Sequence, residues 1–288
     1  MMAFINDHFI DEKEATIGIG DLSIQRGFGI FDFFRTSNHV PLFLDDYLER
    51  FYRSATQLRL QPLHAREELK KIIFELIDKN PISTSGVKMI LTGGYSADGF
   101  EPATPNFIIT QHLVEIASEV HFEKGLKIML HEYLRDVPTA KSINYLMAIY
   151  LREKVVEKNA DDVLYYKDDM VLEFPRSNVF IVTKNQTVVT PLENVLHGIT
   201  RKKVLEIAGK KYRAQERAVT VAELKNVAEV FLTSTTKRIL PVLEIDGSIV
   251  GDGKPGEITR EVYRSFLNLE EKYISYNVIP SLKTAYNY

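Results

Sequence analysis

The spacing of hydrophobic residues alternates between two periods along the 288-residue chain, and this alternation constrains the fold more than any other feature of the sequence. Helical spacing marks residues 45–58 and 66–79, where one face of each segment is apolar. Strand-like runs occupy residues 28–34, 87–91 and 106–110. Strands and helices interspersed in this way predict an α+β fold.

The second half of the chain is richer in short strands. We expect a strand at residues 126–132 and a helix at residues 142–158. Four short strand-like runs follow, at residues 163–166, 170–173, 179–183 and 187–189. Asp246-Gly247 separates two β-prone runs, which is a strong hairpin signal. Further helices are expected to start near Arg201 and Glu257, and residues 275–288 are expected to be ordered only by packing.

The length of the chain exceeds what one compact core usually needs, so we expect two domains. The mixed, charged segment at residues 112–124 interrupts the regular patterns and marks the boundary. The sequence therefore predicts a small N-terminal α/β domain over residues 1–116 and a larger C-terminal domain over residues 117–288.

The composition excludes several classes of function. A net charge of −3 provides no basic surface for a nucleic-acid backbone, and the absence of cysteine excludes disulfides, thiolate nucleophiles and Cys-ligated zinc. The seven histidines show no metal-ligand spacing, so no metal site is expected. The first residues lack the regions of a signal peptide and no apolar run is long enough to cross a bilayer, which predicts a soluble, cytoplasmic protein.

Lys141 is the first candidate for chemistry, because it lies where the strand-like segment gives way to the predicted helix. The positive end of a helix dipole disfavours an ammonium, and partial desolvation would lower the lysine pKa further. The neutral amine could then form a Schiff base with an aldehyde and move a proton. The alternative is a surface lysine in the first turn of a helix.

Glu173 ends an apolar strand and precedes Pro175 and the turn-forming pair Ser177-Asn178. A carboxylate at this place could keep a heterocyclic nitrogen protonated. The alternative is a solvent-facing glutamate at the end of a strand.

Two segments are suited to bind a phosphate group. Residues 197–200 precede a predicted helix, whose first N–H groups could bind an anion. Residues 233–238 follow a strand and are rich in hydroxyl groups. Arg50, on the predicted helix at residues 45–58, could add a bidentate charge, unless it pairs with Asp46 on the same helix.

Taken together, these segments resemble the class IV aminotransferases, which are the fold type IV pyridoxal-phosphate enzymes. The similarity runs from about Ile5 to Phe266, over almost the whole chain. The matching segments occur in the order of the family, at residues 27–32, 47–50, 141–145, 173–180, 198–201 and 234–236, followed by Pro241-Val242. The resemblance implies a two-domain enzyme whose larger domain contains a β-barrel-like sheet, and it implies a homodimer.

The resemblance also implies a role for individual residues. Lys141 bonds covalently to pyridoxal 5'-phosphate and moves the proton of the substrate Cα, and Glu173 is the partner of the pyridine nitrogen. Tyr145 is expected to bind the phenolic oxygen of the cofactor. The groups expected around the phosphate are Arg50, Ile199, Thr200, Ser234 and Thr235, and those expected to line the substrate pocket are Phe31 and Thr236.

The sequence departs from the family where the substrate is bound. Gly93 follows the strand at residues 87–91, where the family often has an arginine, within a long loop at residues 92–102. Ala97, Asp98 and Gly99 stand near the place of an arginine and a histidine in D-amino-acid aminotransferases. Three further departures are Asp32 for a glutamate, Tyr47 for a histidine, and Arg176 for a small residue.

The sequence favours branched-chain L-amino acids with 2-oxoglutarate, because residues 138–140 and 144–145 resemble the branched-chain enzymes most. A D-amino-acid aminotransferase is an alternative, since the 32-residue spacing of Lys141 and Glu173 resembles that branch. A 4-amino-4-deoxychorismate lyase shares the scaffold, although residues 234–236 resemble the transaminase version of that turn. A protein of this fold that binds ligands without the cofactor is a fourth hypothesis.

Overall fold

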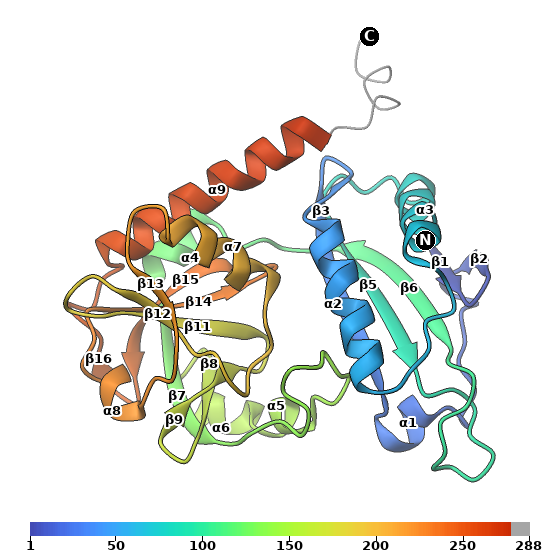
Figure 1. Ribbon diagram of the computed structural model, residues 1–288, viewed down its shortest axis with the longest axis horizontal. Coiled ribbons are helices and arrows are strands. Elements are labelled where there is room, and N and C mark those ends of the chain that lie inside the picture. The colour runs from blue at the N-terminus through green and yellow to red at the C-terminus, as the bar shows by residue number, and fades with distance from the viewer. Residues whose placement is uncertain (278–288) are drawn as a thin grey trace. The chain divides into compact units, whose positions relative to one another are not determined.

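The computed structural model describes residues 1–277, which form two compact units (Figure 1). The first unit contains Met1–Val114, Ala140–Asn144 and the described residues from Glu270 onward. The second unit contains Glu115–Thr139 and Tyr145–Leu269. The structure therefore does not divide at one point near residue 116. Lys141 was expected in the C-terminal domain, but residues 140–144 pair with a strand of the first unit and belong to it.

The first unit is built on a six-stranded antiparallel sheet in the order β2-β1-β6-β5-β3-β4. Its strands are β1 (Met2–Ile5), β2 (His8–Asp11), β3 (Gly29–Ser37), β4 (Val40–Pro41), β5 (Ser85–Thr92) and β6 (Phe107–Leu113). Its helices are α1 (Leu22–Arg26), α2 (Leu44–Gln57) and α3 (Arg66–Lys79). These boundaries agree with the predicted strands and with both predicted helices to within a few residues.

One face of this sheet forms the core of the first unit. Ile30 and Phe34 of β3 and Met89 of β5 point to this face and are fully buried. Helix α2 packs on β3, and α3 packs on β1 and β6 (Figure 1). Leu48 and Phe51 of α2 supply the apolar contacts. Side chains at the alternate positions point to the opposite face, which is only partly buried.

The second unit contains a ten-stranded mixed sheet. Its main path runs β13-β12-β11-β14-β15-β7-β8-β9, while β10 pairs with β11 and β16 with β15. The strands are β7 (Leu126–Glu132), β8 (Asp162–Lys167), β9 (Met170–Val171), β10 (Glu173–Phe174), β11 (Ser177–Val182), β12 (Val188–Thr190), β13 (Ala214–Glu216), β14 (Glu229–Ser234), β15 (Arg238–Ile245) and β16 (Ser248–Ile249). The predicted hairpin is confirmed, since Asp246 and Gly247 both have positive φ in the β15–β16 turn.

Of the helices of the second unit, those expected near Arg201 and Glu257 are confirmed, α4 and α8 were not predicted, and the one predicted at residues 142–158 differs. They are α4 (Glu119–Lys124), α5 (Leu146–Tyr150), α6 (Arg152–Glu157), α7 (Ile199–Ala208), α8 (Val221–Leu224) and α9 (Glu257–Asn277), of which α9 extends into the first unit. The helix predicted at residues 142–158 begins only at Leu146 and is divided at Leu151. Tertiary pairing of residues 140–144 takes precedence over their helical spacing.

Helix α9 continues to the end of the described chain, so residues 275–277 are helical and the rest of the predicted tail lies outside the described residues. Within residues 1–277, no helix combines the length and the apolar character needed to cross a bilayer.

The first turn of α9 depends on the carboxylate of Glu229. This group accepts hydrogen bonds from the N–H groups of Ile258 (3.1 Å) and Thr259 (2.7 Å) and from the Thr259 hydroxyl (2.6 Å).

We expect Glu229→Ala to lower the free energy of unfolding by about 2 kcal/mol, because the buried first-turn amides lose their acceptor. Urea denaturation measures this change. Glu206→Ala, at a half-exposed site on α7, should cost less than about 0.5 kcal/mol, and an equal loss in both variants would contradict the capping role.

Candidate active site

Lys141 is held in the first unit by hydrogen bonds of its main chain. Its carbonyl oxygen accepts from the N–H of Phe31 (2.9 Å), and its own N–H donates to Oγ of Ser54 (3.1 Å). Two residues further on, the N–H of Ile143 donates to the carbonyl of Gly29 (3.1 Å). Residues 140–144 thus lie along β3 as an extended segment, and Lys141 has a fixed main-chain position.

Gly29 permits this close approach of two chain segments. A Cβ atom at residue 29 would lie 2.8 Å from the carbonyl oxygen of Leu91 and 3.2 Å from the side chain of Ile143. Both separations are shorter than ordinary van der Waals contact, so any larger residue would displace the segment that carries Lys141.

The side chain of Lys141 extends over the ring of Phe31, with Nζ 4.5 Å from the ring centre. Phe31, predicted to line the substrate pocket, therefore contacts the predicted cofactor lysine directly. The structure also corrects the reasoning from the helix dipole. Helix α5 begins five residues after Lys141, and a strand-like segment rather than a helix N-terminus carries this residue.

Arg50 lies on the buried face of α2, where it forms a bidentate pair with Asp32 of β3. Its Nε and Nη2 atoms lie 2.9 and 2.6 Å from the two carboxylate oxygens, and both side chains are almost fully buried. Asp32, which was not considered as a partner from the sequence, is therefore a bidentate partner of Arg50. This pair fixes the orientation of the guanidinium group. Binding of a phosphate by Arg50 stays a prediction.

In the second unit, Glu173 is buried rather than solvent-facing, with 5% of its surface exposed. Its Oε1 accepts from both Nε (3.0 Å) and Nη2 (2.6 Å) of Arg135. Its Oε2 accepts from the N–H of Leu196 (2.9 Å) and from Nδ2 of Asn178 (3.4 Å). Four donors therefore compensate the buried negative charge and hold the carboxylate in one orientation.

Asn178 connects Glu173 to the segment that leads into α7. Its Nδ2 donates to the carbonyl of Leu196 at 2.7 Å. A Cβ atom at residue 198 would lie 2.2 Å from Oδ1 of Asn178, so only glycine fits there. The two segments predicted from sequence, residues 173–180 and 197–200, are thus packed together in the second unit.

The N-terminus of α7 is open to an anion. The first hydrogen bond of the helix runs from Lys202 N–H to the Gly198 carbonyl (3.0 Å), so the amides of Ile199 and Thr200 have no acceptor within the helix. Gly198 supplies no side-chain cap, and the first turn contains no acidic residue. This arrangement suits a phosphate group, as the sequence predicted for Ile199 and Thr200.

The hydroxyl-rich turn of residues 234–236 follows β14. Thr233, just before the turn, pairs with Asn178, which in turn pairs with Glu173, so the three side chains lie on one face of the sheet. The buried hydroxyl oxygen of Thr233 has no hydrogen-bond partner within the described chain, and the same holds for Ser177. Buried hydroxyl groups of this kind are suited to bind a polar ligand.

The remaining predicted residues occupy the ends of elements in the second unit. Tyr145 is partly buried at the N-cap position of α5. Ser234 accepts from the N–H of Lys237 at 3.1 Å, which closes the β14–β15 turn. Thr235 and Thr236 are partly buried within the turn, where the Thr236 carbonyl accepts from the N–H of Ala117. Their contacts with cofactor or substrate stay predictions.

Tyr165 is a buried phenol on the strand next to β7. Burial raises its pKa well above the usual range, and its hydroxyl has no hydrogen-bond partner among the described residues. The phenol therefore stays neutral at physiological pH.

The loop after β5 is anchored at its base by Asp21. The Asp21 carboxylate accepts from the Thr92 hydroxyl (2.7 Å) and from Nδ2 of Asn106 (2.8 Å). Burial would raise the pKa of Asp21, but hydrogen bonds from Ser23, Thr92 and Asn106 outweigh it and lower the pKa. At the tip, Asp98 accepts from the N–H groups of Phe100 and Glu101.

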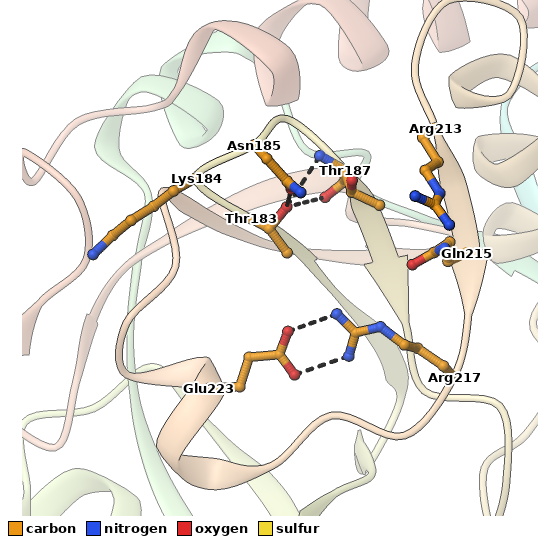
Figure 2. A pocket seen from close by; sticks show the side chains of 8 residues that line it. All are labelled: Thr183, Lys184, Asn185, Thr187, Arg213, Gln215, Arg217 and Glu223. Carbon is orange, nitrogen blue, oxygen red and sulfur yellow. Dashed lines mark hydrogen bonds and ion pairs between the residues drawn. The ribbon is translucent and has the colours of Figure 1, made fainter.

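A polar hollow of about 430 Å³ lies elsewhere in the second unit (Figure 2). It contains none of the predicted site residues. Arg217 forms a two-bond pair there with Glu223 (2.8 and 2.6 Å; Figure 2), and Lys184 donates to Asn226 (2.7 Å). Among the described residues, no group of three or more histidine, aspartate or glutamate side chains converges as metal ligands. The hollow is therefore not the candidate site.

Two residues that contact the predicted site were missed from the sequence. Ser54 occupies the apolar stripe of α2, and a polar residue at such a position is a signal for a buried partner. Arg135 precedes Lys141 by only six residues, yet its partner Glu173 lies 38 residues away in sequence. Local patterns contain no information on that pairing.

The Arg135–Glu173 pair can be tested by removing one partner or both. We expect Arg135→Met to lower the free energy of unfolding by about 3 kcal/mol, because it leaves a buried carboxylate without its cation. Arg135→Met combined with Glu173→Gln should recover most of this loss. Urea denaturation measures both variants. A double variant as unstable as Arg135→Met alone would contradict the explanation from unpaired charge.

The chain matches the family model of class IV aminotransferases over residues 29–245. A D-alanine aminotransferase of Bacillus licheniformis is 30% identical over 277 residues, which cover 93% of this chain and 96% of that protein. A branched-chain amino acid aminotransferase from Escherichia coli shares the fold with a TM-score of 0.87 at 21% identity, covering 93% of this chain and 94% of that chain. A Legionella pneumophila protein assigned as a 4-amino-4-deoxychorismate lyase has a TM-score of 0.81 at 26% identity, covering 90% of this chain and 97% of that chain.

The α+β fold and the enzyme class expected from the sequence are confirmed. This chain belongs to the class IV aminotransferases, which use pyridoxal phosphate.

Proposed function

We propose that this protein is a pyridoxal-phosphate-dependent transaminase that exchanges an amino group between a D-amino acid and a 2-oxo acid. The observation that carries the proposal is the pair of fixed groups described above. Lys141 is held by its main chain on β3, and Glu173 is held by four donors beside the open N-terminus of α7.

The residues of the chain fit this cofactor. The buried, unpartnered hydroxyl of Thr233 lies on the same face of the sheet as the Glu173 carboxylate. The uncapped amides of Ile199 and Thr200 suit the phosphate, and we propose that Ser234, Thr235 and Arg50 add further donors to it. We propose that Tyr145 donates to the phenolic oxygen of the cofactor.

In this proposal Lys141 serves as both the attachment point and the base. Its Nζ would hold the aldehyde of pyridoxal phosphate covalently and, once free, would accept the proton from the substrate Cα. The main-chain hydrogen bonds keep the amine in position through these steps. The ring of Phe31 lies against the amine and excludes water from one side of it.

Glu173 would keep the pyridine nitrogen of the bound cofactor protonated. Arg135 stabilises the ionised form of this carboxylate, which is the form that accepts a hydrogen bond from a protonated ring nitrogen. Bound pyridoxal phosphate supplies the electron sink for the pair left by the broken Cα–H bond.

A D-amino acid is proposed first because a D-alanine aminotransferase is 30% identical over 93% of the chain. The motifs at residues 138–140 and 144–145 favour branched-chain L-amino acids instead, but the branched-chain structures compared are only 21–24% identical. Likeness at that level supports the fold and not the substrate. Elimination of pyruvate, as in the lyases, is the remaining alternative because of the similarity to the Legionella protein.

A substrate panel decides among these activities. The purified protein, supplied with pyridoxal phosphate, is assayed with the D and L forms of alanine and leucine in the presence of 2-oxoglutarate. We expect transfer from D-alanine, measured as pyruvate and D-glutamate. Transfer from L-leucine alone would identify a branched-chain enzyme, and release of pyruvate from aminodeoxychorismate without any transfer would identify a lyase.

Replacement of the lysine tests the cofactor chemistry itself. We expect Lys141→Ala to lower kcat by at least about 10⁴-fold, because the variant loses both the covalent attachment and the base. Reduction of the wild-type holoenzyme with borohydride should fix the cofactor to the peptide that contains residue 141, as detected by mass spectrometry. Substantial turnover by Lys141→Ala, or labelling of a different lysine, would overturn the assignment.

Two further proposals follow from the family. We propose a homodimer, to be measured by light scattering, where a monomer at working concentration would contradict it. We also propose a cytoplasmic location, to be tested by cell fractionation.

A further inference from the structure

The partly buried face of the first unit's sheet carries an unexplained lysine. Strand β5 alternates, so Val87 and Met89 point into the core while Lys88 between them points to the opposite face. Lys88 pairs across the sheet with Phe33 of β3 and with Thr110 of β6. The Lys88 side chain is exposed, so packing in the core does not explain why a charged residue stands in the middle of this central strand.

Lys88 and Lys141 contact the same aromatic ring. Nζ of Lys88 lies 5.6 Å from the centre of the Phe31 ring, and Nζ of Lys141 lies 4.5 Å from that centre. Both distances are measured to the same ring centre. The two nitrogen atoms can therefore be no further apart than the sum of these distances. Within the first unit, a second ammonium group therefore lies at most about 10 Å from the reactive amine, beside the same aromatic ring.

The charge of Lys88 is not compensated by a carboxylate. Among the described residues, the Phe31 ring is its only charged or aromatic contact, and it forms no ion pair. The nearest acidic residue on β3, Asp32, points to the core face and pairs there with Arg50. The surface around Phe31 is thus positive and attracts an anion.

We propose that Lys88 binds the carboxylate of the amino-acid substrate. This inference rests on the proposed transamination, in which the substrate amine reacts at the place of Lys141 Nζ. An amino acid has its carboxylate one carbon away from that amine, and the carboxylate needs a cation on the same side of the sheet. Lys88 meets this need, while Gly93 stands where the family often has an arginine.

Arg26 is the rival cation of the first unit. It lines an apolar hollow of about 220 Å³ with Leu22, Phe28, Phe100 and Pro102. Its Nη1 donates to the carbonyl of Gln25 at 3.0 Å. Among residues 1–277, Arg26 has no recorded contact with the Phe31 ring, whereas Lys88 and Lys141 both contact it. The geometry therefore favours Lys88.

The experiment compares a charged ligand with a neutral ligand of the same shape. Holoenzyme is titrated with propionate and with propionamide in a calorimeter at constant ionic strength, for the wild type and for Lys88→Met, Lys88→Arg and Arg26→Met. We expect Lys88→Met to weaken propionate binding by about tenfold or more and to leave propionamide unchanged, because only propionate uses the charge. The KM for D-alanine should rise by a similar factor, while Lys88→Arg stays within a few-fold of the wild type.

Lys71→Met, at an exposed lysine of α3, is the matched control and should bind propionate as the wild type does. The proposal is overturned if wild-type holoenzyme does not bind propionate, if Lys88→Met binds it within twofold of the wild type, or if Lys88→Met loses both ligands equally. Loss of propionate binding only in Arg26→Met would assign the carboxylate to that arginine. Failure of transamination itself would appear in the wild-type assay, independently of these titrations.

Discussion

The hydrogen bonds between residues 140–144 and β3 are the interaction on which the candidate site depends. They bring a segment from the middle of the chain onto the sheet of the first unit and give Lys141 its place. The anchors use main-chain atoms of Lys141 and Ile143, so none of them occupies the Lys141 side chain. Gly29 and Ser54 are required by this arrangement, because one allows the close approach and the other supplies the acceptor.

The two units solve the problem of buried charge in the same way. In each, a carboxylate that lies deep in the protein is paired with an arginine: Asp32 with Arg50 in the first unit and Glu173 with Arg135 in the second. A buried charge without a partner is costly, so each arginine both permits its acid to be buried and fixes its orientation. Fixed, paired charges are a suitable basis for electrostatic catalysis because they need no reorganisation during the reaction.

The sequence was sufficient where local patterns decide the structure. The helices at residues 44–57 and 66–79 and the β15–β16 hairpin were predicted because hydrophobic period and turn chemistry are local properties. The environment of Lys141 was not predicted, because the segment that contains it pairs with a distant strand instead of continuing the helix that the spacing of residues 142–145 suggests. The partners of Arg50 and Glu173 were missed for the same reason, since contacts between distant residues leave no periodic signal.

The uncapped start of α7 has a consequence for the supply of the enzyme in the cell. An anion that occupies the amides of Ile199 and Thr200 binds the folded chain and not the unfolded chain, so its concentration enters the folding equilibrium. Proteolysis removes mainly molecules that are transiently unfolded. Scarcity of such a ligand would therefore raise the unfolded fraction of the chain and make it more susceptible to proteolysis.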